Sequence, residues 1–190
     1  MANTARNNAL HIQTALSRFG RDQRGVSLFE FALTFPILII LFLGMVEFGE
    51  AFSINRRVTD AAATASDLVA QYPMITSADL ADIALVTDEL IKPYSTTPFG
   101  MVITSVVADE YNNTTVGWSY ATGTGATARA VGSAVTLPTG LTEAGTSVIM
   151  VETSYQFSPT VGLFLLGTHD LEGIAYFRPR LTSVVVKTDG

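Results

Sequence analysis

A single carboxylate lies near the start of a long apolar segment. A basic, polar stretch ends at Arg24-Gly25, and the apolar residues begin at once with Val26 and enclose Glu30. A carboxylate in lipid costs about 2.5–3.5 kcal/mol or more near the centre of a membrane helix, and less near its end. Glu30 therefore needs a reason to be there. We expect it to find a cationic partner when the chain is assembled or recognised.

The apolar segment, residues 26–48, predicts a membrane-spanning helix. At a rise of about 1.5 Å per residue it is long enough to cross a hydrocarbon core of about 30 Å. The apolar part of a cleavable secretory signal is shorter, about 7–15 residues, and ends at a small-residue site. This segment instead ends in Glu47-Phe48-Gly49-Glu50. We therefore predict a retained anchor.

Three residues modify the predicted anchor. Pro36 cannot donate a hydrogen bond to the carbonyl of Ala32, which predicts a kink or local unwinding. Gly44 is a second position at which the helix is easily deformed, because glycine is conformationally permissive. Glu47 is expected to mark the outer membrane interface, with a charge partner in an assembled complex as the alternative.

The distribution of charge predicts orientation and argues against nucleic acid as a partner. Residues 1–25 carry four arginines against Asp22, a net +3, and the whole chain is −6, which leaves −9 for residues 26–190. The excess of arginine before the anchor favours an N-terminus in the cytoplasm, with residues 50–190 on the other side of the membrane. The chain has no cysteine, so disulfides and thiolate chemistry are excluded.

The remaining sequence predicts an α+β fold. The helix continues through 49–71, with apolar residues at helical spacing from Ile54 to Leu68. A second, short helix begins at a cap over 76–79 and ends at Lys92-Pro93. Four antiparallel strands follow, and the helices are expected to cover one face of their sheet. The predicted strands are 101–107, 114–120, 149–157 and 174–180, the first two pairing as a hairpin, with a Gly/Thr-rich loop over 121–146.

These features together resemble the TadE family of the tight-adherence (Tad/Flp) pilus systems, which belongs with the type IV prepilin-like proteins. The residues that carry the resemblance are Asp22, Arg24-Gly25-Val26, Glu30-Phe31-Ala32-Leu33, Phe35-Pro36-Ile37-Leu38, Gly44-Met45-Val46-Glu47-Phe48-Gly49, Ala51-Phe52 and Val58-Thr59-Asp60-Ala61-Ala62. The runs 151–159 and 177–180 also look like the C-terminal pattern of such proteins. Phe31 differs from the tyrosine usual in the major pilins, whose mature chains are also much shorter. The resemblance is therefore to a minor pilin, or pseudopilin.

The resemblance implies processing and a set of partners. A prepilin peptidase would cut between Gly25 and Val26, removing a cytoplasmic leader over 1–25. Glu30, one helical turn beyond, would then serve as counter-ion for an α-ammonium group. The implied partners are this peptidase, a second pseudopilin, the major Flp-type pilin, the inner-membrane assembly platform and membrane lipid. The protein would be a single-pass inner-membrane protein with a periplasmic domain over 72–190.

The implied function is structural: initiating or regulating assembly of an adhesive pilus. We expect no enzymatic activity, no cofactor and no metal site. The alternative is a signal-anchored envelope protein whose external domain binds a ligand or scaffolds another complex.

The residues Gly123–Ala128 fit a loose dinucleotide-binding pattern, but the glycines and proline that follow forbid the helix that such a site needs. His169-Asp170 with Glu172 is expected to be a solvated turn. The apolar run 161–166 packs on the core or contacts a membrane or neighbouring subunit.

Overall fold

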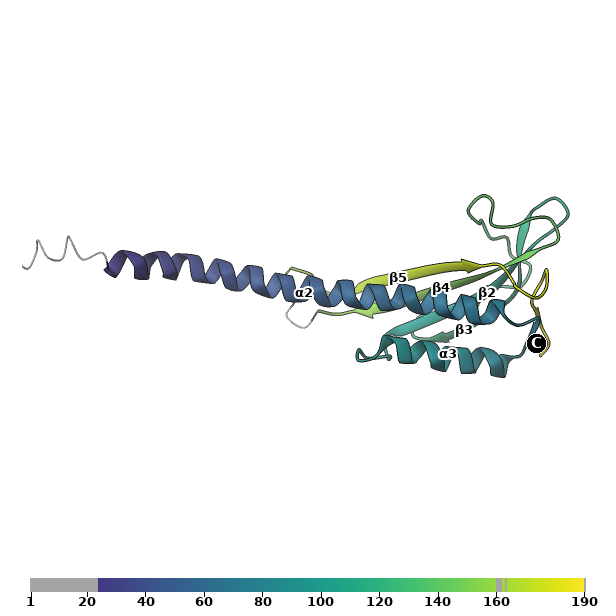
Figure 1. The fold of residues 1–190 in the computed structure, drawn as a ribbon, viewed down its shortest axis with the longest axis horizontal. Coiled ribbons are helices and arrows are strands. Elements are labelled where there is room, and N and C mark those ends of the chain that lie inside the picture. The colour runs from purple at the N-terminus through teal and green to yellow at the C-terminus, as the bar shows by residue number, and fades with distance from the viewer. Residues whose placement is uncertain (1–23, 160–161, 163, 190) are drawn as a thin grey trace, which may run out of the picture. The chain divides into compact units, whose positions relative to one another are not determined.

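The computed structural model describes residues 24–159, 162 and 164–189, and most of the expected leader lies outside them. The described residues form two helices, α2 (Arg24–Ala70) and α3 (Ser77–Ile91). They also form a four-stranded antiparallel sheet and a second sheet of two short strands. The chain divides into two compact units between Val46 and Glu47, and α2 contributes to both. The α+β prediction is confirmed (Figure 1).

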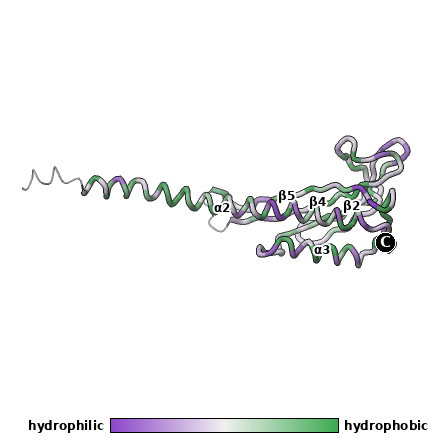
Figure 2. The backbone as a smooth tube through the Cα atoms, viewed as in Figure 1, coloured by the Kyte–Doolittle hydropathy of each residue, from purple (hydrophilic) through white to green (hydrophobic). Residues whose placement is uncertain are grey.

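The first unit contains the apolar half of α2. Its large side chains from Val26 to Val46 are exposed, and the most apolar window of the helix has no buried residue. Figure 2 shows this stretch as a hydrophobic helical tube. Helical structure is unbroken through Pro36, so of the two predicted alternatives local unwinding is not observed, and a kink stays a prediction. One proline removes a single backbone bond, and the bonds on either side hold the helix together.

In the second unit, one face of α2 is buried by small residues. Ile54, Val58, Ala61 and Ala65 are at most 2% exposed, as their spacing predicted. Leu68 is only partly buried, and Val69 is fully buried in its place. Alanines leave little side-chain bulk between the helix and what it covers. The backbone of α2 can therefore approach the sheet closely.

One close approach of α2 to the sheet is at a glycine of β5 (His169–Phe177). A Cβ atom on Gly173 would lie 2.9 Å from Cα of Thr59 and 3.0 Å from the carbonyl oxygen of Val58. The neighbouring strand β4 (Ser147–Phe157) adds a direct bond, because the Thr153 hydroxyl donates to the Val58 carbonyl at 2.9 Å. Helix and sheet thus meet backbone to backbone.

Helix α3 follows its predicted signals. Thr76 is the N-cap, and its side chain and that of Asp79 form a reciprocal capping box. The buried residues of the helix are Leu80, Ile83, Ala84, Thr87 and Ile91. The apolar ones among them join side chains of α2 and of the sheet in one hydrophobic core. Both helices therefore pack on one face of the sheet.

The sheet has the order β3-β2-β4-β5, with all neighbours antiparallel. The predicted hairpin is confirmed as β2 (Phe99–Ala108) paired with β3 (Thr114–Gly123). The last predicted strand, 174–180, is placed too late, because β5 begins at His169 and ends at Phe177. Pro179 lies beyond the end of this edge strand, as expected for a residue without an amide donor.

The C-terminal segment closes the domain in a way that the sequence did not predict. Strand β6 (Val186–Lys187) pairs in parallel with β1 (Met74–Ile75), and the Trp118 indole donates to the Val185 carbonyl at 2.8 Å. The Asp189 carboxylate accepts the Ser77 amide at 2.7 and 2.9 Å, at the first turn of α3. The segment therefore ties β1 and β3 to the first turn of α3.

We expect Gly173→Ala to destabilise the domain, because its new methyl group would lie against the α2 backbone and 2.7 Å from Oγ1 of Thr153. Overpacking of this kind costs about 1–3 kcal/mol. The matched control is Gly49→Ala, since a Cβ there meets nothing within 4 Å, and it should stabilise the helix by roughly 0.5–1 kcal/mol. Denaturant unfolding of the full chain in detergent, followed by Trp118 fluorescence, measures both. Equal stability of the two variants would contradict the close contact.

We expect Asp189→Asn to make the domain less stable at neutral pH and to change its acid sensitivity. The hydrogen bond from the Ser77 amide, helped by Lys187, holds the pKa of the Asp189 carboxyl below its ordinary 3.8. A lowered folded-state pKa adds stability that is present above the ordinary value and lost as pH falls below it. The stability difference between the two chains should therefore shrink as pH falls below about 3.8. A difference that stays constant through that range would contradict the capping role.

Candidate processing and assembly segment

The residues of the expected processing site lie in the first turns of α2. Gly25, Val26 and Glu30 all have exposed positions there. A Cβ on Gly25 would meet no described atom within 4 Å. Nothing in the described chain therefore requires glycine at this position.

Glu30 lies on the same helical face as Val26, one turn further along, because residues four apart are neighbours on a helix. It takes part in no ion pair or hydrogen bond with the residues that the structure describes. Phe31 is also exposed, and its ring stacks on Phe35 with a centroid distance of 5.1 Å. The start of α2 thus presents one carboxylate among exposed apolar side chains.

Glu47 has a different environment, in which its carboxylate is held by backbone amides. It is 2% exposed, and its two oxygens accept the amides of Phe164 at 3.0 Å and Leu165 at 3.3 Å. Two amide donors satisfy a buried carboxylate that would otherwise be costly. Sequence reasoning placed Glu47 at an interface and did not predict this intramolecular role. The spacing of the two segments, more than a hundred residues, left no signal to find it.

The apolar run near 164 packs on the core of the domain in part, and its contact with a membrane or a neighbouring subunit stays a prediction. Residues 161 and 163 lie outside the described ranges. Leu165 is partly buried and packs against the core, whereas Phe164 is 45% and Leu166 is 76% exposed. The Phe164 ring lies 6.3 Å from that of Phe48 in α2. The loop is thus attached to α2 and still leaves large apolar side chains uncovered.

Arg57 is a structural residue that the sequence did not single out. Its guanidinium donates to the carbonyl of Leu90 at 2.9 Å and lies 5.7 Å from the centre of the Tyr94 ring. A cation near the last carbonyls of a helix is favourable because those carbonyls carry the negative end of the helix dipole. Arg57 thereby ties α2 to the C-terminal end of α3.

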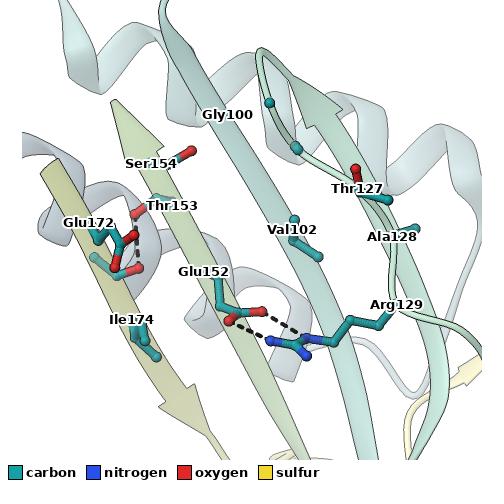
Figure 3. A pocket seen from close by; sticks show the side chains of 13 residues that line it. Gly100, Val102, Thr127, Ala128, Arg129, Glu152, Thr153, Ser154, Glu172 and Ile174 are labelled. Atoms are coloured by element: carbon teal, nitrogen blue, oxygen red, sulfur yellow. Dashed lines mark hydrogen bonds and ion pairs between the residues drawn. The ribbon is translucent and has the colours of Figure 1, made fainter. Parts of the chain in front are cut away.

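A groove lies on the sheet face opposite the helices (Figure 3). It has a volume of about 370 Å³ and is bounded by the loop 125–129 and by side chains of β4 and β5. Arg129 makes a bidentate pair with Glu152, at 2.7 and 2.9 Å, and this hydrogen bonding raises the pKa of Arg129. The groove contains a second carboxylate, Glu172. It forms no ion pair with any of the described residues. Histidine is absent from the groove's lining.

Two minor sequence patterns also have clear positions. The chain after Gly125 continues without helix, as the glycines and proline predicted, so it presents no helix N-terminus to a phosphate. His169 and Asp170 lie in β5, so their prediction as a turn is wrong. Within the described residues, no group of three His, Cys, Asp or Glu side chains is arranged to hold a metal ion.

We expect Glu47→Ala to release the loop at Phe164 and Leu165. A hydrogen bond to a charged acceptor contributes about 1.5–3 kcal/mol, so the two amides should exchange hydrogen faster by about one order of magnitude or more. Hydrogen exchange read by mass spectrometry on the full chain in detergent measures this change. Glu50→Ala is the control, since Glu50 is a neighbouring carboxylate that makes no hydrogen bond to this loop. Unchanged exchange in Glu47→Ala would contradict the contact.

Comparison with known proteins agrees with the motif at the start of α2. Residues 25–67 match the family model described as TadE-like protein. No curated protein and no solved structure gives a significant match to the chain. The matched range contains Gly25, Glu30, Pro36, Gly44 and Glu47, together with the face of α2 that packs on the sheet. The segment from Gly25 to Asp67 is therefore TadE-like, and it associates this chain with the Tad pilus machinery.

Proposed function

We propose that this protein is a minor pilin, or pseudopilin, that helps to initiate or regulate assembly of an adhesive Tad/Flp pilus. The observation that carries the proposal is the pair Gly25 and Glu30 at the start of α2. Both are exposed, the glycine has open space around it, and the carboxylate lies one turn beyond Val26. Neither residue stabilises the described fold. A role in recognition by other molecules explains why both are present.

Processing by a prepilin peptidase fits the local physics of this helix end. The bond between Gly25 and Val26 lies in the first turn of α2, where amides lack intrahelical partners. Glycine is about 1 kcal/mol less favourable than alanine in a helix. Arg24 places a positive charge at the positive end of the helix dipole, and the first turn has no acidic residue to offset it. This turn should therefore open readily into the extended form that a peptidase binds.

Cleavage would place an α-ammonium group on Val26 beside the carboxylate of Glu30. In a low-dielectric setting, a charged hydrogen bond between such groups is strong. The partner is the ammonium of the same chain or, in an assembled complex, that of a neighbouring chain, and both arrangements use the same pair of charges. Either arrangement removes the cost of an isolated carboxylate in lipid.

The apolar half of α2 supplies the surface for membrane insertion and for helix partners. Its most apolar window has no buried residue, so no described part of the chain covers it. We propose that α2 spans the inner membrane once, with a cytoplasmic N-terminus and a periplasmic domain. Lipid surrounds it before assembly, and the helices of a second pseudopilin, the major Flp-type pilin and the assembly platform replace lipid during assembly. The role is structural and involves no catalysis.

The groove with the Arg129–Glu152 pair favours a second candidate function. An anchored envelope protein could use this groove, which lies on the sheet face away from the helices, to bind a ligand. Its mixture of a free carboxylate and hydroxyl groups suits a polar or cationic ligand. This alternative predicts that the chain works without removal of its leader.

We expect the protein isolated from membranes to begin at Val26, as read by intact mass and N-terminal sequencing. Gly25→Val should accumulate the uncut precursor, because a branched side chain would block close approach of the backbone to the peptidase. Glu30→Ala should reduce the cut fraction, because recognition loses its charge. Deleting the peptidase should leave only precursor.

Matched variants separate recognition from general damage. Gly20→Val alters another leader glycine, whose fifth following residue is Gly25 and not a carboxylate. Glu50→Ala removes a carboxylate beyond the other end of the apolar segment. Both should be cut as efficiently as the unaltered chain. A chain that keeps its leader in the presence of the peptidase would overturn the pilin proposal and favour the anchored envelope protein.

A further inference from the structure

Four large apolar side chains are exposed together where the folded domain begins. Phe48 and Phe52 are 54% and 73% exposed and lie four residues apart, on one face of α2. Phe164 and Leu166, 45% and 76% exposed, come from the loop that Glu47 holds against α2. The contact between the Phe48 and Phe164 rings joins the two pairs. We refer to these four residues as the interfacial patch.

The surface between the helix part of the patch and β5 is a shallow, open apolar depression. It is lined by Phe48, Gly49, Ala51, Phe52, Asn55 and Leu171. A contiguous exposed apolar surface of this kind marks a site that a membrane or another protein covers. The position of the patch along α2 indicates which of the two covers it.

The patch directly follows the apolar segment of the helix. Phe48 is two residues beyond Val46, which is about 3 Å of helix rise. If residues 26–46 cross a bilayer, they occupy about 30 Å and place Phe48 at the hydrocarbon boundary. Phe52 then lies about one turn, or 5–6 Å, further out. Aromatic side chains concentrate in this zone because their rings suit the headgroup region.

A basic residue continues the same helical face. Arg56 lies four residues beyond Phe52, and its side chain is 78% exposed. An arginine at this position can extend to lipid phosphates while the aromatic rings lie deeper. Its pairing with Asp60 is long, at 3.9 Å, so its guanidinium is available for such contacts. The order of apolar segment, aromatic rings and cation is that of a membrane interface.

Glu47 explains how an irregular loop can lie at this depth. Backbone amides cannot be left without acceptors near lipid, because each unsatisfied group costs several kcal/mol. The Glu47 carboxylate accepts two of them, from Phe164 and Leu165, and is itself satisfied in return. The loop can therefore turn apolar side chains outward without exposing these two donors.

We propose that the interfacial patch enters the interfacial zone of the bilayer, at the end of the apolar segment nearer the folded domain, so that lipid covers Phe48, Phe52, Phe164 and Leu166. The domain is then held against the membrane by a loop distant in sequence as well as by the helix that leads into it. This inference rests on the membrane insertion of α2 proposed above. The molecule that covers the patch is lipid. Coverage by a neighbouring protein chain is the outcome of the test that would contradict the proposal.

Site-specific labelling provides the test, because the natural chain has no cysteine. Single cysteines at Leu166→Cys and Phe52→Cys carry an environment-sensitive fluorophore, in the full chain reconstituted at one copy per lipid nanodisc. Leu38→Cys, inside the apolar segment, is the control for insertion of α2. Tyr111→Cys is the control for a label surrounded by water, because Tyr111 lies in the β2–β3 turn and is 85% exposed. Trp118 fluorescence confirms that each labelled chain is folded.

Lipids carrying a quencher near the headgroup should remove most of the fluorescence at Leu166→Cys and Phe52→Cys. Lipids with the quencher near the chain end should act mainly on Leu38→Cys, and neither should affect Tyr111→Cys. Leu166→Cys behaving like Tyr111→Cys would overturn the inference, and blue-shifted emission without lipid quenching would overturn it in favour of protein contact. Failure to quench Leu38→Cys would instead show that α2 does not insert, so the two proposals fail separately.

Discussion

The structure depends on the close contact between the backbone of α2 and the backbone of β5. Gly173 has no side chain, and a Cβ there would reach the Val58 carbonyl and the Cα of Thr59. The Thr153 hydroxyl uses that same carbonyl as its acceptor. This contact sets the distance between helix and sheet, and the alanines of α2 are the side chains that such a distance allows.

Helix α2 therefore meets two requirements along its length. Before Val46 its side chains are apolar and exposed, which suits a surrounding lipid or other apolar helices. After Glu47 one face carries small, buried residues and the other carries charges such as Arg56 and Asp60. The TadE-like match, residues 25–67, covers both parts. The match thus covers a candidate membrane anchor together with the face of α2 that packs on the sheet.

Polar groups where the domain begins are satisfied by partners distant in sequence. Glu47 accepts amides from the loop at Phe164, and Arg57 donates to the end of α3 at Leu90. The C-terminal segment acts similarly at the other end of the domain, through Asp189 and the Trp118 indole. These contacts hold a small sheet and two helices together in a chain without disulfides. The proposed contact of the interfacial patch with lipid adds a restraint where α2 enters the domain.

The sequence by itself determined the helices, most of their buried faces and the TadE-like pattern at the start of α2, because each depends on residues close together in the chain. The spacing of Gly25 and Glu30, the alanine face of α2, the cap at Thr76 and the β2–β3 hairpin are local patterns of this kind. Only the tertiary structure decided the start of β5, the pairing of β1 with β6, and the partners of Glu47 and Arg57. Those contacts join segments separated by tens of residues or more, and their energy comes from hydrogen bonds whose donors and acceptors meet only after the sheet and helices have packed.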